Sequence, residues 1–216
     1  MILLWATRLA LLLATVSAVA LARRRADHWP FASLLVSLLL INTTRAVLSA
    51  HFGLIRPLGS PPFTGAARVA FHVDQAGELA SAAAFAALVI WLFSKRRSLA
   101  VIPGIAWVAA VAYLATHYPE IRGEPLRQVY LAAELAALAV AAMSFGVFWR
   151  RRESMTPART CALVCFLVDA GTLFMGAWRW GFWTAWNLQQ GAYLAMYAII
   201  ITLQVFSWSS SRSPLR

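Results

Sequence analysis

The chain has 216 residues, of which 61% are apolar and only 12% are charged, and its formal net charge is +11. Soluble domains contain about 25% charged residues, so this composition excludes an ordinary soluble globular protein and favours a membrane protein. The basic residues form short clusters beside apolar stretches rather than one continuous patch. This distribution argues against nucleic acid as a partner.

Seven apolar stretches of about twenty residues follow one another along the chain, each long enough to cross a bilayer as a helix. We place them at residues 2–22, 30–50, 66–93, 99–118, 126–148, 160–182 and 188–208. The connections between them are short, which leaves no room for a separate soluble domain. The sequence therefore predicts an all-α, polytopic integral membrane protein, with residues 1–216 forming a single seven-transmembrane-helix domain.

Arginine clusters occupy alternate connections between these stretches. They lie at residues 23–25, 95–97 and 150–152, at Arg159, and in the tail at Arg212 and Arg216. By the positive-inside rule these segments are cytoplasmic, so the N-terminus is outside and the C-terminus is in the cytoplasm. We expect a multi-pass protein of the cell (inner) membrane whose arginines contact anionic lipid headgroups, at about 1 kcal/mol per basic residue.

Large side chains near the span ends fit this orientation. A tryptophan cluster falls at the predicted outer end of the sixth span and is typical of an interfacial belt: Trp178, Trp180, Trp183 and Trp186. Trp107 lies in the middle of a span instead. Arg8, in the first span, is expected to extend outward to the headgroups.

Acidic residues inside the spans carry the most information about function. Four of the eight acidic residues lie there: Asp74, Glu78, Glu134 and Asp169. Each costs about 2.5–3.5 kcal/mol or more when it faces lipid, so we expect all of them to face the bundle interior. Polar residues on other spans, including Arg45, lie on stripes that can face them.

The polar residues also lie at similar depths. At a rise of 1.5 Å per residue, they fall between about 7 Å below the outer boundary and the midplane, and the inner half is nearly apolar. The sequence predicts a polar pocket that opens outward, with ligand-binding candidates Arg45, His72, Asp74, Glu78, Glu134, Asp169, Tyr193 and Tyr197. We also expect at least one of Glu78 and Asp169 to be protonated near neutral pH.

Several specific chemistries are not indicated. The single lysine, Lys95, lies in a predicted connection, which argues against a retinal Schiff base. Histidines do not occur at zinc-ligand spacing, and we predict no metal site and identify no cofactor. Cys161 and Cys165 are one helical turn apart and are interpreted as small buried side chains.

Three functions remain open. The favoured hypothesis is binding of a small ligand, a lipid headgroup or protons in the outward pocket. The first alternative is an intramembrane enzyme that acts on a lipid or lipid-linked substrate, with His72 as general base beside Asp74 or Glu78. The second is a non-catalytic subunit of a larger complex with a partner membrane subunit, in which the polar residues only hold helices together. Of these, catalysis is less favoured than binding.

Overall fold

The computed structural model describes residues 2–54, 63–94, 96–117, 142–151, 154–177 and 182–210, together with 132, 135, 136 and 139. Over these residues the regular structure consists of helices, with no strand. The all-helical class predicted from the sequence is therefore confirmed for the described part of the chain.

The long helices follow the apolar stretches of the sequence. They are α1 (Ile2–Ala22), α2 (Trp29–Phe52), α3 (Gly65–Phe93), α4 (Ile102–His117), α6 (Pro157–Ala177) and α7 (Phe182–Ser210), with the short 3₁₀ helices η1 (Ala26–His28) and η2 (Arg97–Val101). Residues 142–150 are also helical. They belong to the predicted fifth span, most of which lies outside the described residues, so the count of seven spans stays a prediction.

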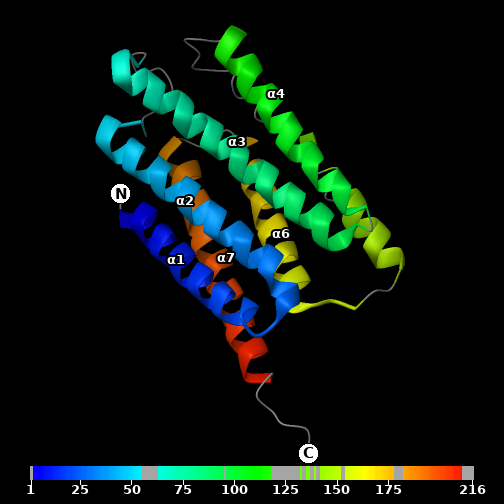
Figure 1. The fold of residues 1–216 in the computed structure, drawn as a ribbon. Coiled ribbons are helices and arrows are strands. Elements are labelled where there is room, and N and C mark those ends of the chain that lie inside the picture. Colours follow the sequence, from blue (N-terminus) through cyan, green and yellow to red (C-terminus); the bar gives the residue numbers. More distant parts are fainter. Residues whose placement is uncertain are drawn as a thin grey trace, which may run out of the picture.

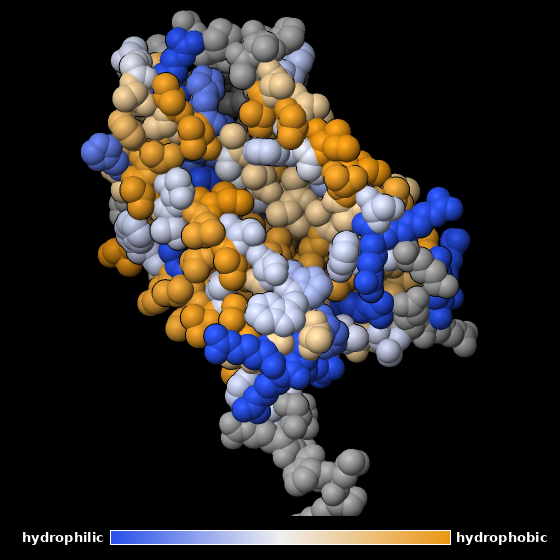
Figure 2. Space-filling view, viewed as in Figure 1, coloured by the Kyte–Doolittle hydropathy of each residue, from blue (hydrophilic) through white to orange (hydrophobic). Residues whose placement is uncertain are grey.

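Four helical segments of the described chain are long and apolar enough to cross a membrane: Ile2–Ala22, Ala26–Phe52, Gly65–Phe93 and Trp186–Ser209. Their outward side chains are apolar as well, including Leu9, Leu13 and Val16 on α1 and Phe206 on α7. Figure 2 shows a broad apolar surface along the helices, with hydrophilic side chains gathered toward the ends. Such a surface suits lipid rather than water, as in a multi-pass membrane protein.

Local chemistry explains where α2 begins and ends. Pro30 lies in its first turn, where a missing backbone N–H removes no helical hydrogen bond. Gly53 follows the last turn with φ 59°, a left-handed conformation that glycine adopts without strain, and its N–H donates to the Ser49 carbonyl. The amide of Leu54 donates to the same carbonyl at 3.2 Å.

The helices form a bundle in which α1 packs against α2 and α7, and α3 packs against α2, α4 and α6 (Figure 1). Side chains at a three- and four-residue spacing on α1 face this interior and are fully buried, including Leu11, Ala14 and Ala18. They meet Leu35 of α2 and Met196 of α7 in one apolar core. Small residues at positions 14 and 18 let neighbouring helices approach closely.

The ends of α1 and α3 and the start of α6 lie at one end of the bundle (Figure 1). Arginines follow or begin each of these helices, at 23–25, 96–97 and 159. We call this end of the bundle the basic end. The Arg24 guanidinium lies 3.5 Å from the ring centroid of Trp208, which joins the end of α1 to the end of α7. Arg159 Nε donates to the Leu92 carbonyl at 3.0 Å, which joins α6 to α3.

Candidate functional site

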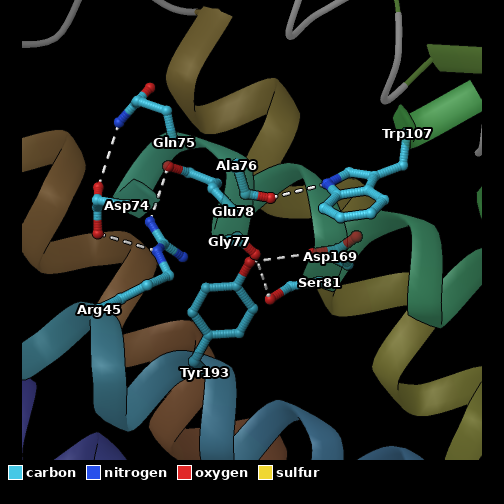
Figure 3. Close-up of polar contacts among 10 residues, drawn as sticks. All are labelled: Arg45, Asp74, Gln75, Ala76, Gly77, Glu78, Ser81, Trp107, Asp169 and Tyr193. Atoms are coloured by element: carbon cyan, nitrogen blue, oxygen red, sulfur yellow. Dashed lines mark hydrogen bonds and ion pairs between the residues drawn. The ribbon is translucent and has the colours of Figure 1, made fainter. Parts of the chain in front are cut away.

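Arg45 of α2 is the centre of the strongest polar contacts inside the bundle. Its Nε lies 3.0 Å from Asp74 Oδ1, and its Nη2 lies 2.9 Å from Glu78 Oε2 (Figure 3). Asp74 and Glu78 are one turn apart on α3, so both carboxylates lie on the same face of the helix. A single guanidinium therefore holds two acids through charge-assisted hydrogen bonds.

Gly77 makes this contact possible. A Cβ atom added at Gly77 would lie 2.9 Å from Arg45 Cδ and 3.3 Å from Ile41 Cγ2, closer than side-chain atoms pack. The Arg45 stem thus crosses α3 over the turn that carries both acids, where only glycine leaves enough space. The sequence analysis did not identify this residue, although its position between Asp74 and Glu78 was a signal.

Two further hydrogen bonds fix this part of α3 (Figure 3). Gln75 Nε2 donates to Asp74 Oδ2 at 3.2 Å, so both oxygens of the Asp74 carboxylate have a donor. Trp107 Nε1 donates to the Ala76 carbonyl at 2.9 Å. This bond ties α4 to α3 and explains why a tryptophan lies in the middle of an apolar stretch rather than at its end.

Asp169 of α6 lies in a different environment. The Tyr193 hydroxyl of α7 donates to Asp169 Oδ1 at 3.0 Å (Figure 3). Thr172 Oγ1 lies 3.5 Å from the same hydroxyl. Within the described residues, Asp169 has no cationic group at ion-pair distance. It interacts electrostatically with Glu78 across the contact between α3 and α6.

Arg8 corrects one sequence-based expectation. We expected it to extend outward, but its Nε is buried without a hydrogen-bond partner in the described part of the chain. Tyr197, Arg45, Tyr193 and Asp74 lie within electrostatic range of its guanidinium. The reason is its position: Leu4, Arg8 and Leu11 follow an inward helical spacing, and both leucines are buried.

The remaining candidates are placed as follows. Tyr197 is buried and belongs to the apolar core, while it also interacts with Arg8. The His72 ring lies 5.9 Å from that of its neighbour Phe71, in an edge-on arrangement. Glu134 lies outside the described residues, as do Trp178 and Trp180. Trp183 and Trp186 are in the first turns of α7, not at the end of the sixth span.

Three of the converging residues lie near the same end of the bundle. Arg8 lies about 9 Å from the start of α1, Arg45 about 10 Å from the end of α2, and Asp74 about 14 Å from the start of α3. We call Arg8, Arg45, Asp74, Glu78, Asp169, Tyr193 and Tyr197 the interior polar cluster. The apolar core fills much of the half toward the basic end, with Leu35, Val89 and Cys165 among its members.

Metal binding finds no support in the described residues, where no group of three histidine, cysteine or acidic side chains could hold an ion. Comparison with protein-family models, curated proteins and solved structures finds no match for this chain. The class that the fold defines is a helical membrane protein with several spans.

Proposed function

We propose that this chain is a seven-span membrane protein whose interior polar cluster binds a small ligand, a lipid headgroup or protons that arrive from the outer side. The outer side is the end of the bundle where α1 begins and α2 ends. Residues Arg8, Arg45, Asp74 and Glu78 supply the charges of this site, Asp169 supplies a carboxyl group, and Tyr193 and Tyr197 supply hydroxyl groups.

The observation that carries the proposal is the uneven pairing of charges in the cluster. Arg45 holds two acids, whereas Arg8 and Asp169 have no opposite charge at ion-pair distance among the described residues. A cluster that only held helices together would gain stability by pairing these two groups as well. An ionisable group inside a membrane costs about 2.5–3.5 kcal/mol or more, which favours a functional role for those left unpaired.

The distribution of polar and apolar residues supports binding rather than conduction. Toward the basic end, α1, α2, α6 and α7 contribute mainly apolar side chains to the core, including Leu11, Phe31, Cys161 and Ile200. A polar path through the bundle would need donors and acceptors along its whole length. The cluster therefore suits a ligand that enters and leaves at the same side.

Cysteine accessibility tests the site and its opening together. Cys161 and Cys165, both buried, are first replaced by alanine to give a clean background. In that background, Ser49→Cys and Asn42→Cys place thiols on the buried face of α2 that carries Arg45. We expect a small membrane-impermeant thiol reagent, added from outside, to label at least one of them.

The matched control is Leu38→Cys on the same helix, because Leu38 lies in the apolar core and is fully buried. We expect this thiol to stay unlabelled in the folded protein and to react after denaturation. If both Ser49→Cys and Asn42→Cys stay as silent as Leu38→Cys, the interior polar cluster is sealed and the proposed binding function is wrong.

A further inference from the structure

Two buried polar atoms, one on α1 and one on α7, lack a hydrogen-bond partner in the described chain. They are Arg8 Nε and Gln190 Oε1. Gln190 is only 7% exposed. A buried donor or acceptor left without a partner is costly, and most such groups in proteins meet a partner or a bound molecule.

The packing of the two helices brings these groups to one place. Thr7 Oγ1 donates to the Leu3 carbonyl at 2.8 Å and also lies 3.3 Å from the Gln190 carbonyl oxygen, which places the neighbour of Arg8 against α7. Gln190, Tyr193 and Tyr197 recur at three- and four-residue spacing on one face of α7, and both tyrosines lie within electrostatic range of Arg8. A guanidinium, an amide and two phenols thus converge on the same side of α1.

The nearby acids are already engaged. Asp74 accepts hydrogen bonds from Arg45 and Gln75, and Glu78 is held by Arg45. Arg45 itself is a like charge in the field of Arg8. Within the described residues, no carboxylate lies at ion-pair distance from Arg8. The two neighbouring positive charges therefore favour the binding of an anion there.

We propose that Arg8, with Gln190 beside it, binds an oxyanion, a phosphate or carboxylate group, of the molecule that the interior polar cluster receives. This inference rests on the proposed function and names the chemistry of its ligand. The planar guanidinium matches the oxygens of such a group through parallel hydrogen bonds. Gln190 Oε1 accepts a hydrogen bond from a hydroxyl or ammonium group next to it.

Two sources can supply this oxyanion: the headgroup of a lipid in the outer leaflet, or a water-soluble anion. The purified full-length protein in a phosphate-free maltoside detergent separates them, with thermal unfolding followed by tryptophan fluorescence. One arm titrates sodium phosphate and sodium acetate against chloride at constant ionic strength. The other titrates a short-chain phosphatidylglycerol against a maltoside of matched chain length.

We expect a saturable rise of the melting temperature in at least one arm. Arg8→Gln should weaken the apparent affinity about tenfold or more, the effect of losing a charge-assisted hydrogen bond. Arg8→Lys keeps the charge without the planar fork and should give an intermediate loss. A rise in the lipid arm alone identifies a headgroup, and a rise in the soluble arm alone identifies a free anion.

Arg24→Gln is the matched control, because Arg24 lies at the opposite, basic end against Trp208. The melting temperature of this variant should rise with phosphate, acetate or lipid concentration as it does for the wild type. The inference is overturned if no probe raises the melting temperature, or if the rise survives Arg8→Gln. A lipid effect that disappears in Arg24→Gln but not in Arg8→Gln also overturns it, since the headgroup then binds at the basic end.

A second variant keeps the test valid if Arg8→Gln folds poorly. Arg8→Met removes the buried cation but keeps an apolar stem, and in ligand-free detergent it should be at least as stable as the wild type. Marked loss of stability would show that Arg8 serves the fold, against our inference. If Ser49→Cys or Asn42→Cys is labelled while Arg8 variants change nothing, the proposed function stands and only the oxyanion is wrong.

Discussion

The charged residues of the cluster are held in two different ways. Arg45 satisfies buried Asp74 and part-buried Glu78 together, so the loss of the guanidinium leaves both acids without this cation. Asp169 depends on a neutral hydroxyl, that of Tyr193. Substitutions at these positions should therefore differ in effect, even though all of these residues are ionisable and lie inside apolar stretches.

Gly77→Ala tests the close passage of Arg45 over α3. The added methyl would lie 2.9 Å from Arg45 Cδ, on a side chain held by two ion pairs. We expect a loss of about 1–3 kcal/mol in unfolding free energy, as for other overpacked positions. Gly191→Ala is the control, because a Cβ at Gly191 meets nothing within 4 Å. Equal effects of the two substitutions in a denaturation series would contradict the proposed role of Gly77.

The protonation of Asp169 is the second prediction at this scale. The sequence led us to expect that Glu78 or Asp169 is protonated, and the structure gives Glu78 an ion pair at 2.9 Å. Among the described residues Asp169 has a neutral hydroxyl as partner and no cation at ion-pair distance, and such a carboxyl favours its neutral form inside a membrane. Infrared spectroscopy of the purified protein at pH 7 should show a protonated carboxyl band that Asp169→Asn removes.

Two variants check that assignment. Asp169→Asn should fold nearly as well as the wild type, since an amide can still accept the Tyr193 hydroxyl. Glu78→Gln should leave the infrared band in place but lower stability by weakening the Arg45 contact. A wild-type spectrum without the band, or a band that Glu78→Gln removes, would show that Asp169 is ionised.

At the scale of helices, hydropathy was sufficient for some features. The helix α1 covers the same residues as the first apolar stretch, because length and composition alone define such a segment. The side to which Arg8 projects was not predictable in this way. Its inward direction depends on the contact of α1 with α7. Thr7 and Gln190, which meet in this contact, are 183 positions apart in the sequence.

Some contacts of the interior polar cluster were also predictable from the sequence, and others were not. The placement of Asp74 and Glu78 on one face follows from helical spacing, and the similar depths of Asp74 and Arg45 indicated their contact. The contact of Arg45 with Glu78 was not indicated, because Glu78 lies nearer the middle of its span. The pairing of Asp169 with Tyr193 requires α6 and α7 to lie side by side with matching rotation. A single sequence carries no direct signal for such lateral neighbours.

Helix packing provides a prediction of its own. Ala14 and Ala18 lie on the face of α1 that is buried in the core, and both are 0% exposed. Ala18→Leu should cost about 1–3 kcal/mol by forcing the helices apart. Val16→Leu, on the outward face at 59% exposure, adds one methylene and should change stability little. Similar melting temperatures for the two variants would argue against close packing of α1.

The whole molecule is divided along its length into halves of different chemistry. One half holds the interior polar cluster between the helices, and the other holds most of the apolar core and ends in the arginines of the basic end. The large exposed side chains are apolar on α1 and α7 alike, including Leu9, Val16, Val205 and Phe206. This asymmetry gives the protein a distinct inner and outer side once its orientation is known.

The orientation in the membrane is a prediction for the whole molecule. The structure links the sides on which two parts of the chain must lie. Because Arg24 lies 3.5 Å from the Trp208 ring centroid, the α1–α2 connection and the end of α7 must be on the same side of the membrane. Anionic headgroups favour each basic residue at the cytoplasmic surface by about 1 kcal/mol, so the cluster at Arg23, Arg24 and Arg25 should keep that side inside.

A reporter that is active only in the cytoplasm should work at the C-terminus and fail when inserted after Gly53, at the opposite end of α2. A reporter that is active only outside should give the reverse pattern. Activity of the outside reporter at the C-terminus would invert the topology and place the interior polar cluster toward the cytoplasm.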